Sequence, residues 1–149
     1  MNGSDTLVLR AVEKGCFIDG QLSLAALCNE GLVGTVDLYN YDPINNRAAV
    51  GIVVKEALRR QGYGRAMLKA LDTLCCEQLN LHQVYCDIVE GNKASLRLFL
   101  SCDYRQIGLM HGWVLVGDSY RDVVRLQKIF SNVFDKPNAD KLACMLRRE

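Results

Sequence analysis

The sequence predicts an α/β fold, an α+β arrangement in which helices pack on a mixed sheet. Three observations favour this class: an antiparallel meander in the first half, a strand–glycine loop–helix–strand unit in the middle, and a closing hairpin near the end. The chain has 149 residues, which is enough for one domain with a substantial core. We therefore expect one domain built around a single sheet.

The meander is indicated by apolar stretches separated by turn residues. A first strand is expected over residues 6–12, and residues 22–28, 32–41 and 47–54 follow as three consecutive antiparallel strands. The stretches NEG and DPINN between them are typical of turns, because Gly, Asn and Pro adopt the required backbone angles readily. Gly34 lies inside a strand pattern, which indicates a β-bulge there.

A helical stripe follows the glycine loop, and residues 84–89 return as a strand, which makes a βαβ-like unit with a right-handed crossover. Asn92 is the expected N-cap of a second, short helix. Residues 104–130 then split into a hairpin around Gly117-Asp118, and a tail helix is expected after Pro137. The apolar stripe of the first helix is Met67, Leu68, Leu71, Leu74, Cys75 and Leu79; that of the second is Leu96, Leu98, Phe99 and Leu100; that of the tail is Leu142, Met145 and Leu146.

Composition argues against several classes of partner. A net charge of +1 gives no reason to expect nucleic acid or an anionic membrane, and no apolar run approaches the ~20 residues of a membrane span. The N-terminus lacks the pattern of a secretory signal. Seven cysteines without framework spacing indicate reduced, mostly buried thiols in a cytoplasmic protein, and the two distant histidines argue against a metal site.

Charge and flexibility meet where the fourth strand gives way to the first helix. Lys55, Arg59 and Arg60 surround the turn Gly62-Tyr63-Gly64. A helix start offers unpaired N–H groups and a partial positive charge, and glycines allow close approach, so this loop is a candidate phosphate site. The alternative is an ordinary glycine turn with solvated arginines.

Two known phosphate motifs do not fit this loop. The pattern G-x-x-x-x-G-K-[ST] is absent, and the dinucleotide fingerprint G-x-G-x-x-G fails at its third glycine, where Met67 stands. The pattern that remains is R-x-x-G-x-G, over residues 59–64.

This loop resembles the pyrophosphate loop of the GCN5-related N-acetyltransferases (GNAT). About thirty residues on, the segment that begins at Asn92 resembles the family's short helix, and the most similar branch contains ribosomal-protein and spermidine N-acetyltransferases. The resemblance implies a GNAT domain over residues 1–130, followed by the tail helix over residues 131–149.

The resemblance also implies acetyl transfer from acetyl-CoA to a primary amine by direct attack in a ternary complex. A backbone N–H on a bulged strand within residues 51–54 would stabilise the oxyanion. Expected catalytic residues are Glu90, Asn92 and Ser95. Expected cofactor-binding residues are Ile52, Val53, Val54, Arg59, Arg60, Gln61, Gly62, Tyr63, Gly64, Arg65, Asn92, Ser95 and Phe99.

The sequence departs from the family at its acid and its base. Many relatives carry a Tyr where Phe99 stands and a Glu where Ala49 stands. Asp37, Asp87 and Glu90 are the remaining carboxylates expected near the acceptor side.

The family also places two helices between its first and second strands, and they form one wall of the acceptor site. Here nine residues, 13–21, separate the strands, which is too few for two helices. The wall is missing, or the tail helix or a second chain supplies it, or the chain is shortened.

Two functions therefore stand. The first is an N-acetyltransferase acting on a polyamine, another small amine or a protein N-terminus. The second is a catalytically degenerate CoA-binding module that acts as a sensor or interaction subunit. The apolar side of the tail helix makes a homodimer possible.

Overall fold

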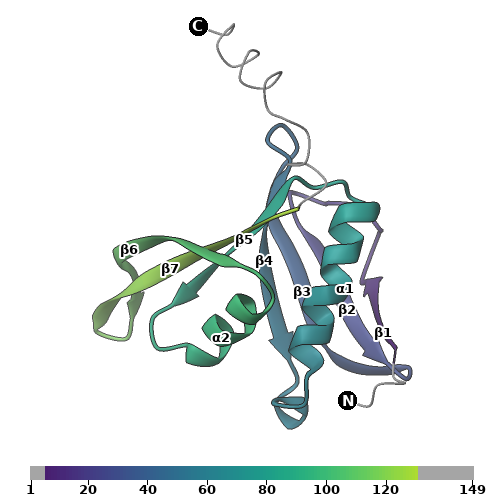
Figure 1. The fold of residues 1–149 in the computed structure, drawn as a ribbon, viewed down its shortest axis with the longest axis horizontal. Helices are drawn as coiled ribbons and strands as arrows, with labels where there is room; N and C mark the ends of the chain where they lie inside the picture. The colour runs from purple at the N-terminus through teal and green to yellow at the C-terminus, as the bar shows by residue number, and fades with distance from the viewer. Residues whose placement is uncertain (1–5, 131–149) are drawn as a thin grey trace, which may run out of the picture.

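The computed structural model describes residues 6–130 and shows one seven-stranded mixed sheet with two helices (Figure 1). The strand order is β1-β2-β3-β4-β5-β7-β6. Within the described residues, no helix is long and apolar enough to cross a membrane. The elements are β1 (Leu7–Ala11), β2 (Leu22–Cys28), β3 (Gly31–Asp42), β4 (Arg47–Val54), the 3-10 turn η1 (Glu56–Leu58), α1 (Tyr63–Glu77), β5 (Gln83–Val89), α2 (Lys93–Ser101), β6 (Arg105–Val116) and β7 (Ser119–Ile129).

The predicted topology is confirmed. Strands β1 to β4 pair antiparallel in sequence order, β4 and β5 pair parallel across α1, and β6 and β7 form the closing hairpin. The predicted bulge next to Gly34 is also present. Ala26 pairs with Gly34, whereas Leu27 pairs with Leu32, so Val33 is the extra residue on β3.

Both helices pack on one face of the sheet (Figure 1). In β2, β4, β5 and β7, and in β3 from Gly34 on, the even-numbered residues face these helices because side chains alternate along a strand, and they form the core with α1. In β1 the odd-numbered residues face the same way, because they pair with even-numbered residues of β2. The odd-numbered residues of β4 and β5, and those of β3 after the bulge, lie on the other face, which neither helix of the described part covers. Core residues on the helical face include Leu24, Val36, Leu38, Val50, Met67, Leu68, Leu71, Val84, Phe99 and Leu126.

The short helix α2 begins as predicted, with the Asn92 side chain accepting a hydrogen bond from the Ser95 N–H at 3.2 Å. The predicted apolar side of α2 is wrong at one residue, Leu100. Phe99 is buried, with 3 % of its surface exposed, whereas Leu100 is 45 % exposed. Successive helical residues are rotated by about 100°, so Leu100 turns away once Phe99 faces the core.

The connection from β1 to β2 contains no helix, as its length predicted. It is held to the end of β3, because the Tyr41 N–H donates to Gly20 O at 3.1 Å and the Phe17 ring stacks on the Tyr41 ring at 3.9 Å. The predicted tail helix over residues 131–149, with its apolar side, lies outside the described residues.

The buried cysteines are expected to resist alkylation in the folded protein. Burial raises the pKa of Cys75 and of Cys86 to about 12, so almost no thiolate forms at pH 8, whereas Cys16 is exposed. Iodoacetamide at pH 8 should therefore modify Cys16 first, and all three residues after addition of urea. Peptide mass mapping measures this order, and equal labelling of Cys16 and Cys86 before urea would contradict it.

Candidate functional site

Strands β4 and β5 diverge in the middle of the sheet. Their parallel pairing covers only Arg47 to Ala49 on β4 and Gln83 to Tyr85 on β5, although both strands continue further. Figure 1 shows the two strands separating beyond this point. Because β5 remains paired with β7 along its whole length, the divergence leaves one edge of β4 unpaired with a neighbouring strand.

The open edge of β4 presents backbone donors from alternate residues. The Lys55 N–H donates to Val33 O at 2.9 Å on β3, and hydrogen-bonding direction alternates along a strand. The N–H groups of Ile52 and Val54 therefore face the gap. Val53 instead faces β3, and its side chain is 57 % exposed on the opposite face of the sheet.

The bulge that the family resemblance implied within residues 51–54 is absent. The register between β3 and β4 is regular from Val54 to Ala49 and shifts only between Tyr39 and Asp42, near the turn. The donors of Ile52 and Val54 are exposed to the gap because β5 diverges, not because β4 is bulged.

The glycine loop follows β4 and folds back on it. Arg59 Nε donates to Val54 O at 3.2 Å, and Gln61 Nε2 donates to Ala57 O at 3.2 Å. Arg60 and Gly62 adopt positive φ angles of 64° and 89°, a conformation that Gly62 accepts without strain. These turns close the loop and place Gly62 as the N-cap of α1.

The start of α1 supplies unpaired donors beside this loop. The first intrahelical bond runs from the Ala66 N–H to Gly62 O at 3.1 Å, so helix geometry leaves the N–H groups of Tyr63, Gly64 and Arg65 without an intrahelical partner. A Cβ built on Gly64 would lie 3.0 Å from Leu98 Cδ2 of α2, so glycine allows α1 and α2 to approach closely. Arg59, Arg60 and Arg65 are exposed around this helix end, which therefore fits an anionic group.

The structure brings the three predicted catalytic residues together after the end of β5, where each has a structural partner. Glu90 Oε1 accepts from the Asp122 N–H at 3.0 Å, and Asn92 caps α2 through the Ser95 N–H. A small pocket of about 40 Å³ adjoins Glu90 and Asn92, but not Ser95. It is lined by Ile88, Val89, Glu90, Gly91, Asn92, Lys93, Leu96 and Val124.

Phe99 lies in the core behind this site. Its ring meets Tyr104 edge to face, with centroids 4.9 Å apart. Burial, with the charge of Asp72 nearby, raises the pKa of Tyr104 well above its usual value of 10, so its hydroxyl stays protonated. Phe99 therefore packs α2 against the core through Tyr104.

Small and aromatic residues surround the gap on the face that the helices leave open. Tyr39 pairs with Ala49, and Ala49 pairs with Tyr85, so two tyrosines flank a small residue. Asp37 pairs with Gly51 in the row nearer the divergence, and a Cβ built on Gly51 would lie 3.6 Å from Tyr39 Cε1. These side chains share one face because all are odd-numbered in regularly paired strands.

An ion pair that sequence reasoning missed lies on the same face. Arg125 of β7 donates to both carboxylate oxygens of Asp87, at 2.8 and 2.9 Å, and lies 4.7 Å from the Tyr85 ring centroid. Burial, and next the Asp87 charge, raises the pKa of Tyr39, so its hydroxyl stays protonated at neutral pH. No local sequence pattern predicts this ion pair, because Arg125 and Asp87 are 38 residues apart.

Asp87 and Glu90, the other two carboxylates expected near the acceptor side, have partners, and so does Asp42 at the end of β3, whereas Asp37 has none. Asp87 is held by Arg125, Glu90 by a backbone N–H, and Asp42 by its own turn and by Arg47 at 3.4 Å. Asp37 is half-buried, and no side chain or backbone group among residues 6–130 forms a hydrogen bond or ion pair with its carboxylate. It is the acidic side chain here whose charge is available to a ligand.

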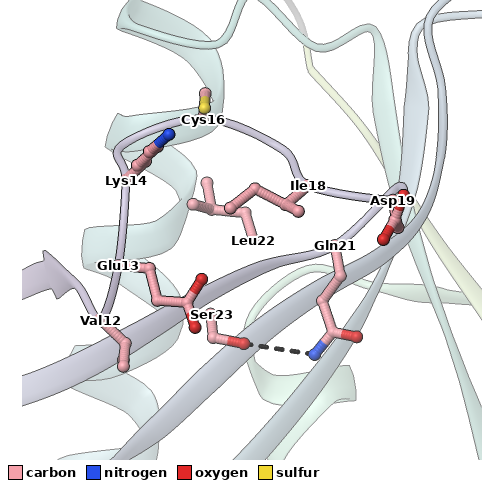
Figure 2. Close-up of a pocket in the computed structure, with 9 residues that line it drawn as sticks. All are labelled: Val12, Glu13, Lys14, Cys16, Ile18, Asp19, Gln21, Leu22 and Ser23. Carbon is pink, nitrogen blue, oxygen red and sulfur yellow. Dashed lines mark hydrogen bonds between the residues drawn. The ribbon is translucent and has the colours of Figure 1, made fainter.

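A larger open pocket, of about 340 Å³, lies at the connection between β1 and β2, away from the glycine loop (Figure 2). Ile18 and Leu22 point into the space that this connection encloses, and Gln21 Nε2 donates to Ser23 Oγ at 3.2 Å. The pocket occupies the position in the sequence where the family resemblance placed a helical wall. It is lined by Val12, Glu13, Lys14, Cys16, Ile18, Asp19, Gln21, Leu22 and Ser23.

Comparisons with solved structures support the fold. Mutant forms of the spermidine/spermine N-acetyltransferase SpeG from Vibrio cholerae match with a TM-score of 0.78 and 18% identity, over 88% of this chain and 99% of that one. A chimera of SpeG from Vibrio cholerae and hSSAT matches with a TM-score of 0.74 and 19% identity, over 79% and 72% of the two chains. A dodecameric SpeG structure from the same organism matches with a TM-score of 0.71 and 19% identity, over 79% and 70%.

Membership of a family is shown by comparison of the sequence with a family profile. A search of curated proteins returns no significant match. The family profile described as "Acetyltransferase (GNAT) domain", however, matches residues 12–105, which span β2 to β5, the glycine loop and α2. This match confirms the predicted family and the predicted class of enzyme, an acetyl-CoA-dependent acyltransferase. The chain belongs to the GNAT acetyltransferase family.

Proposed function

We propose that this protein transfers the acetyl group of acetyl-CoA to a primary amine of a small polyamine, by direct attack in a ternary complex. The observation that carries the proposal is the divergence of β4 from β5, with unpaired donors on one side and the unpaired Asp37 carboxylate on the open face. The structural neighbours described above are spermidine N-acetyltransferases, which supports an amine acceptor.

The residues present fit acetyl-CoA. The N–H groups of Tyr63, Gly64 and Arg65 would receive its pyrophosphate, and Arg59 and Arg60 would add full charges. The N–H groups of Ile52 and Val54 would bond the arm that carries the thioester, and one of them would stabilise the oxyanion. The bound cosubstrate supplies the activated acetyl carbon, and no residue of the protein needs to form a covalent intermediate.

The acceptor side requires a group that attracts a cation and takes its proton. An amine with a pKa of about 10.4 arrives protonated and must lose the proton before it attacks. Asp37 is the available carboxylate, and Tyr39 and Tyr85 offer aromatic faces beside it, although Arg125 already lies over Tyr85. Asp37 thus replaces, on β3, the carboxylate that many relatives carry at the position of Ala49.

Asp37→Asn is expected to lower kcat/KM for a polyamine roughly 100-fold, because the side chain keeps its shape but loses its charge and basicity. Acetylated product is measured by mass spectrometry, with spermidine as the probe amine. Glu77→Gln, which removes an exposed charge from the last residue of α1, on the opposite face of the sheet, is the matched control and should leave kcat/KM unchanged. An unchanged kcat/KM in Asp37→Asn would remove Asp37 from the acceptor site.

The second candidate is a CoA-binding module without catalysis. Ala49 and Phe99 favour it, because neither has the acid–base chemistry of the family residue expected there. Acetyl-CoA binding without turnover of spermidine, smaller amines or peptide N-termini would support this function instead. Self-association stays a prediction, supported by the dodecameric assembly of one structural neighbour.

A further inference from the structure

Lys128 connects both helices to the sheet. It lies on β7, and its side chain is 17 % exposed. The ammonium donates to Asp72 Oδ2 on α1 and to Cys102 O, just after the last residue of α2, at 2.9 Å. It also lies 5.7 Å from the centroid of the Tyr104 ring. One charged group thus contacts both helices that border the gap between β4 and β5.

The same two helices touch again near the glycine loop. Gly64 packs against Leu98, and Arg65 Nη2 donates to Ser101 O at the long distance of 3.5 Å. The start of α1 provides the donors that fit a pyrophosphate, whereas the start of α2 carries Asn92 and Ser95. A single bound molecule that contacts both helix starts therefore depends on the distance between α1 and α2.

Asp72 relies on Lys128. Its Oδ1 is buried without a hydrogen-bond partner among the described residues, and so is the Tyr104 hydroxyl. Burial raises the pKa of Asp72, and the hydrogen bond and charge of Lys128 oppose this rise. Without the ammonium, nothing would offset the cost of removing the Asp72 carboxylate from water. A shift of α1 that exposes Asp72 to water would then be favourable.

We propose that Lys128 is a positioning residue, which fixes α1 against α2 and thereby sets the geometry in which both helix starts bind acetyl-CoA. The inference rests on the proposed function, because it assumes that the cosubstrate lies between these helices. Lys128 acts through the two helices and touches neither the cosubstrate nor the amine.

The test is acetyl-CoA binding by calorimetry, with steady-state kinetics on the whole chain. Lys128→Met should raise the Kd and the KM for acetyl-CoA about tenfold, with kcat at saturating acetyl-CoA and the KM for spermidine nearly unchanged. Lys128→Arg should restore part of the affinity, because a guanidinium can also donate to both Asp72 and Cys102 O. Asp72→Asn, which keeps an acceptor oxygen, should raise the Kd about threefold and serves if the Met variant does not fold.

A general loss of stability is separated from positioning by a second control. Asp42→Ala removes the contacts of the β3–β4 turn, so it should lower Tm without changing the Kd for acetyl-CoA. A Lys128→Met variant with lower Tm but the parent's Kd would overturn the inference alone. Failure of the unmodified chain to bind acetyl-CoA would overturn the proposed function itself.

Discussion

Replacing Gly34 with alanine is expected to lower the free energy of unfolding by about 3 kcal/mol. A Cβ at this position would lie 2.2 Å from Val53 O, 3.1 Å from Val54 Cα and 3.0 Å from Met67 Cε. Met67 has a flexible side chain and can move, but the Val53 carbonyl belongs to the paired backbone of β4. The clash is relieved only if β3 and β4 separate beside the bulge.

Urea denaturation followed by circular dichroism measures this loss. Gly108→Ala is the matched control, because Gly108 also lies in a strand, β6, and an added Cβ there would meet no atom within 4 Å. The control should stay within about 0.5 kcal/mol of the parent. A Gly34→Ala variant that unfolds at the parent's urea midpoint would show that β3 and β4 do not approach as closely as described.

Gly62→Glu is expected to abolish the thermal stabilisation that acetyl-CoA gives to the parent. A ligand at ~100 times its Kd stabilises the folded state by about 2.7 kcal/mol, which a thermal shift assay detects readily. A carboxylate at the N-cap of α1 would repel the phosphates and occupy the space above the helix N–H groups. No atom lies within 4 Å of a Cβ built on Gly62, so the new side chain fits the free protein without a steric clash.

Backbone strain must be separated from charge in this experiment. Any side chain at the positive φ of Gly62 costs roughly 1–2 kcal/mol, so Gly62→Glu should melt earlier even without ligand. Gly62→Ala carries the same strain without the carboxylate and should keep most of the acetyl-CoA shift. If Gly62→Glu shows the parent's full shift, the cosubstrate does not bind at this loop.

Sequence reasoning predicted the elements whose causes are local. The β2–β3 and β3–β4 turns follow from residues that adopt turn conformations, and the cap of α2 follows from Asn92. The bulge beside Gly34 was predicted for the same reason. The basic glycine loop was located because its charges and glycines are contiguous in the sequence.

Features that depend on distant partners were missed. The divergence of β4 from β5 has no sequence signal, because it depends on where two strands more than thirty residues apart stop pairing. Lys128 and Arg125 lie on opposite faces of β7. The sequence of β7 does not predict which carboxylate each of them pairs with. The expected bulge on β4 was wrong because family resemblance, not the residues themselves, supported it.

The direct connection from β1 to β2 has a consequence for the order of folding. Strands β1 to β4 pair only with their neighbours in sequence, and none of the connections between them contains a helix, whereas β4 and β5 are separated by α1. Short loops cost less entropy to close, and proteins rich in local contacts fold faster. The meander and the β6–β7 hairpin are therefore the parts of the described chain that can assemble first. The pairing of β5 with β4 must bring together strands that α1 separates in the sequence, so it is the slower event. The gap between β4 and β5 forms only when this pairing is made.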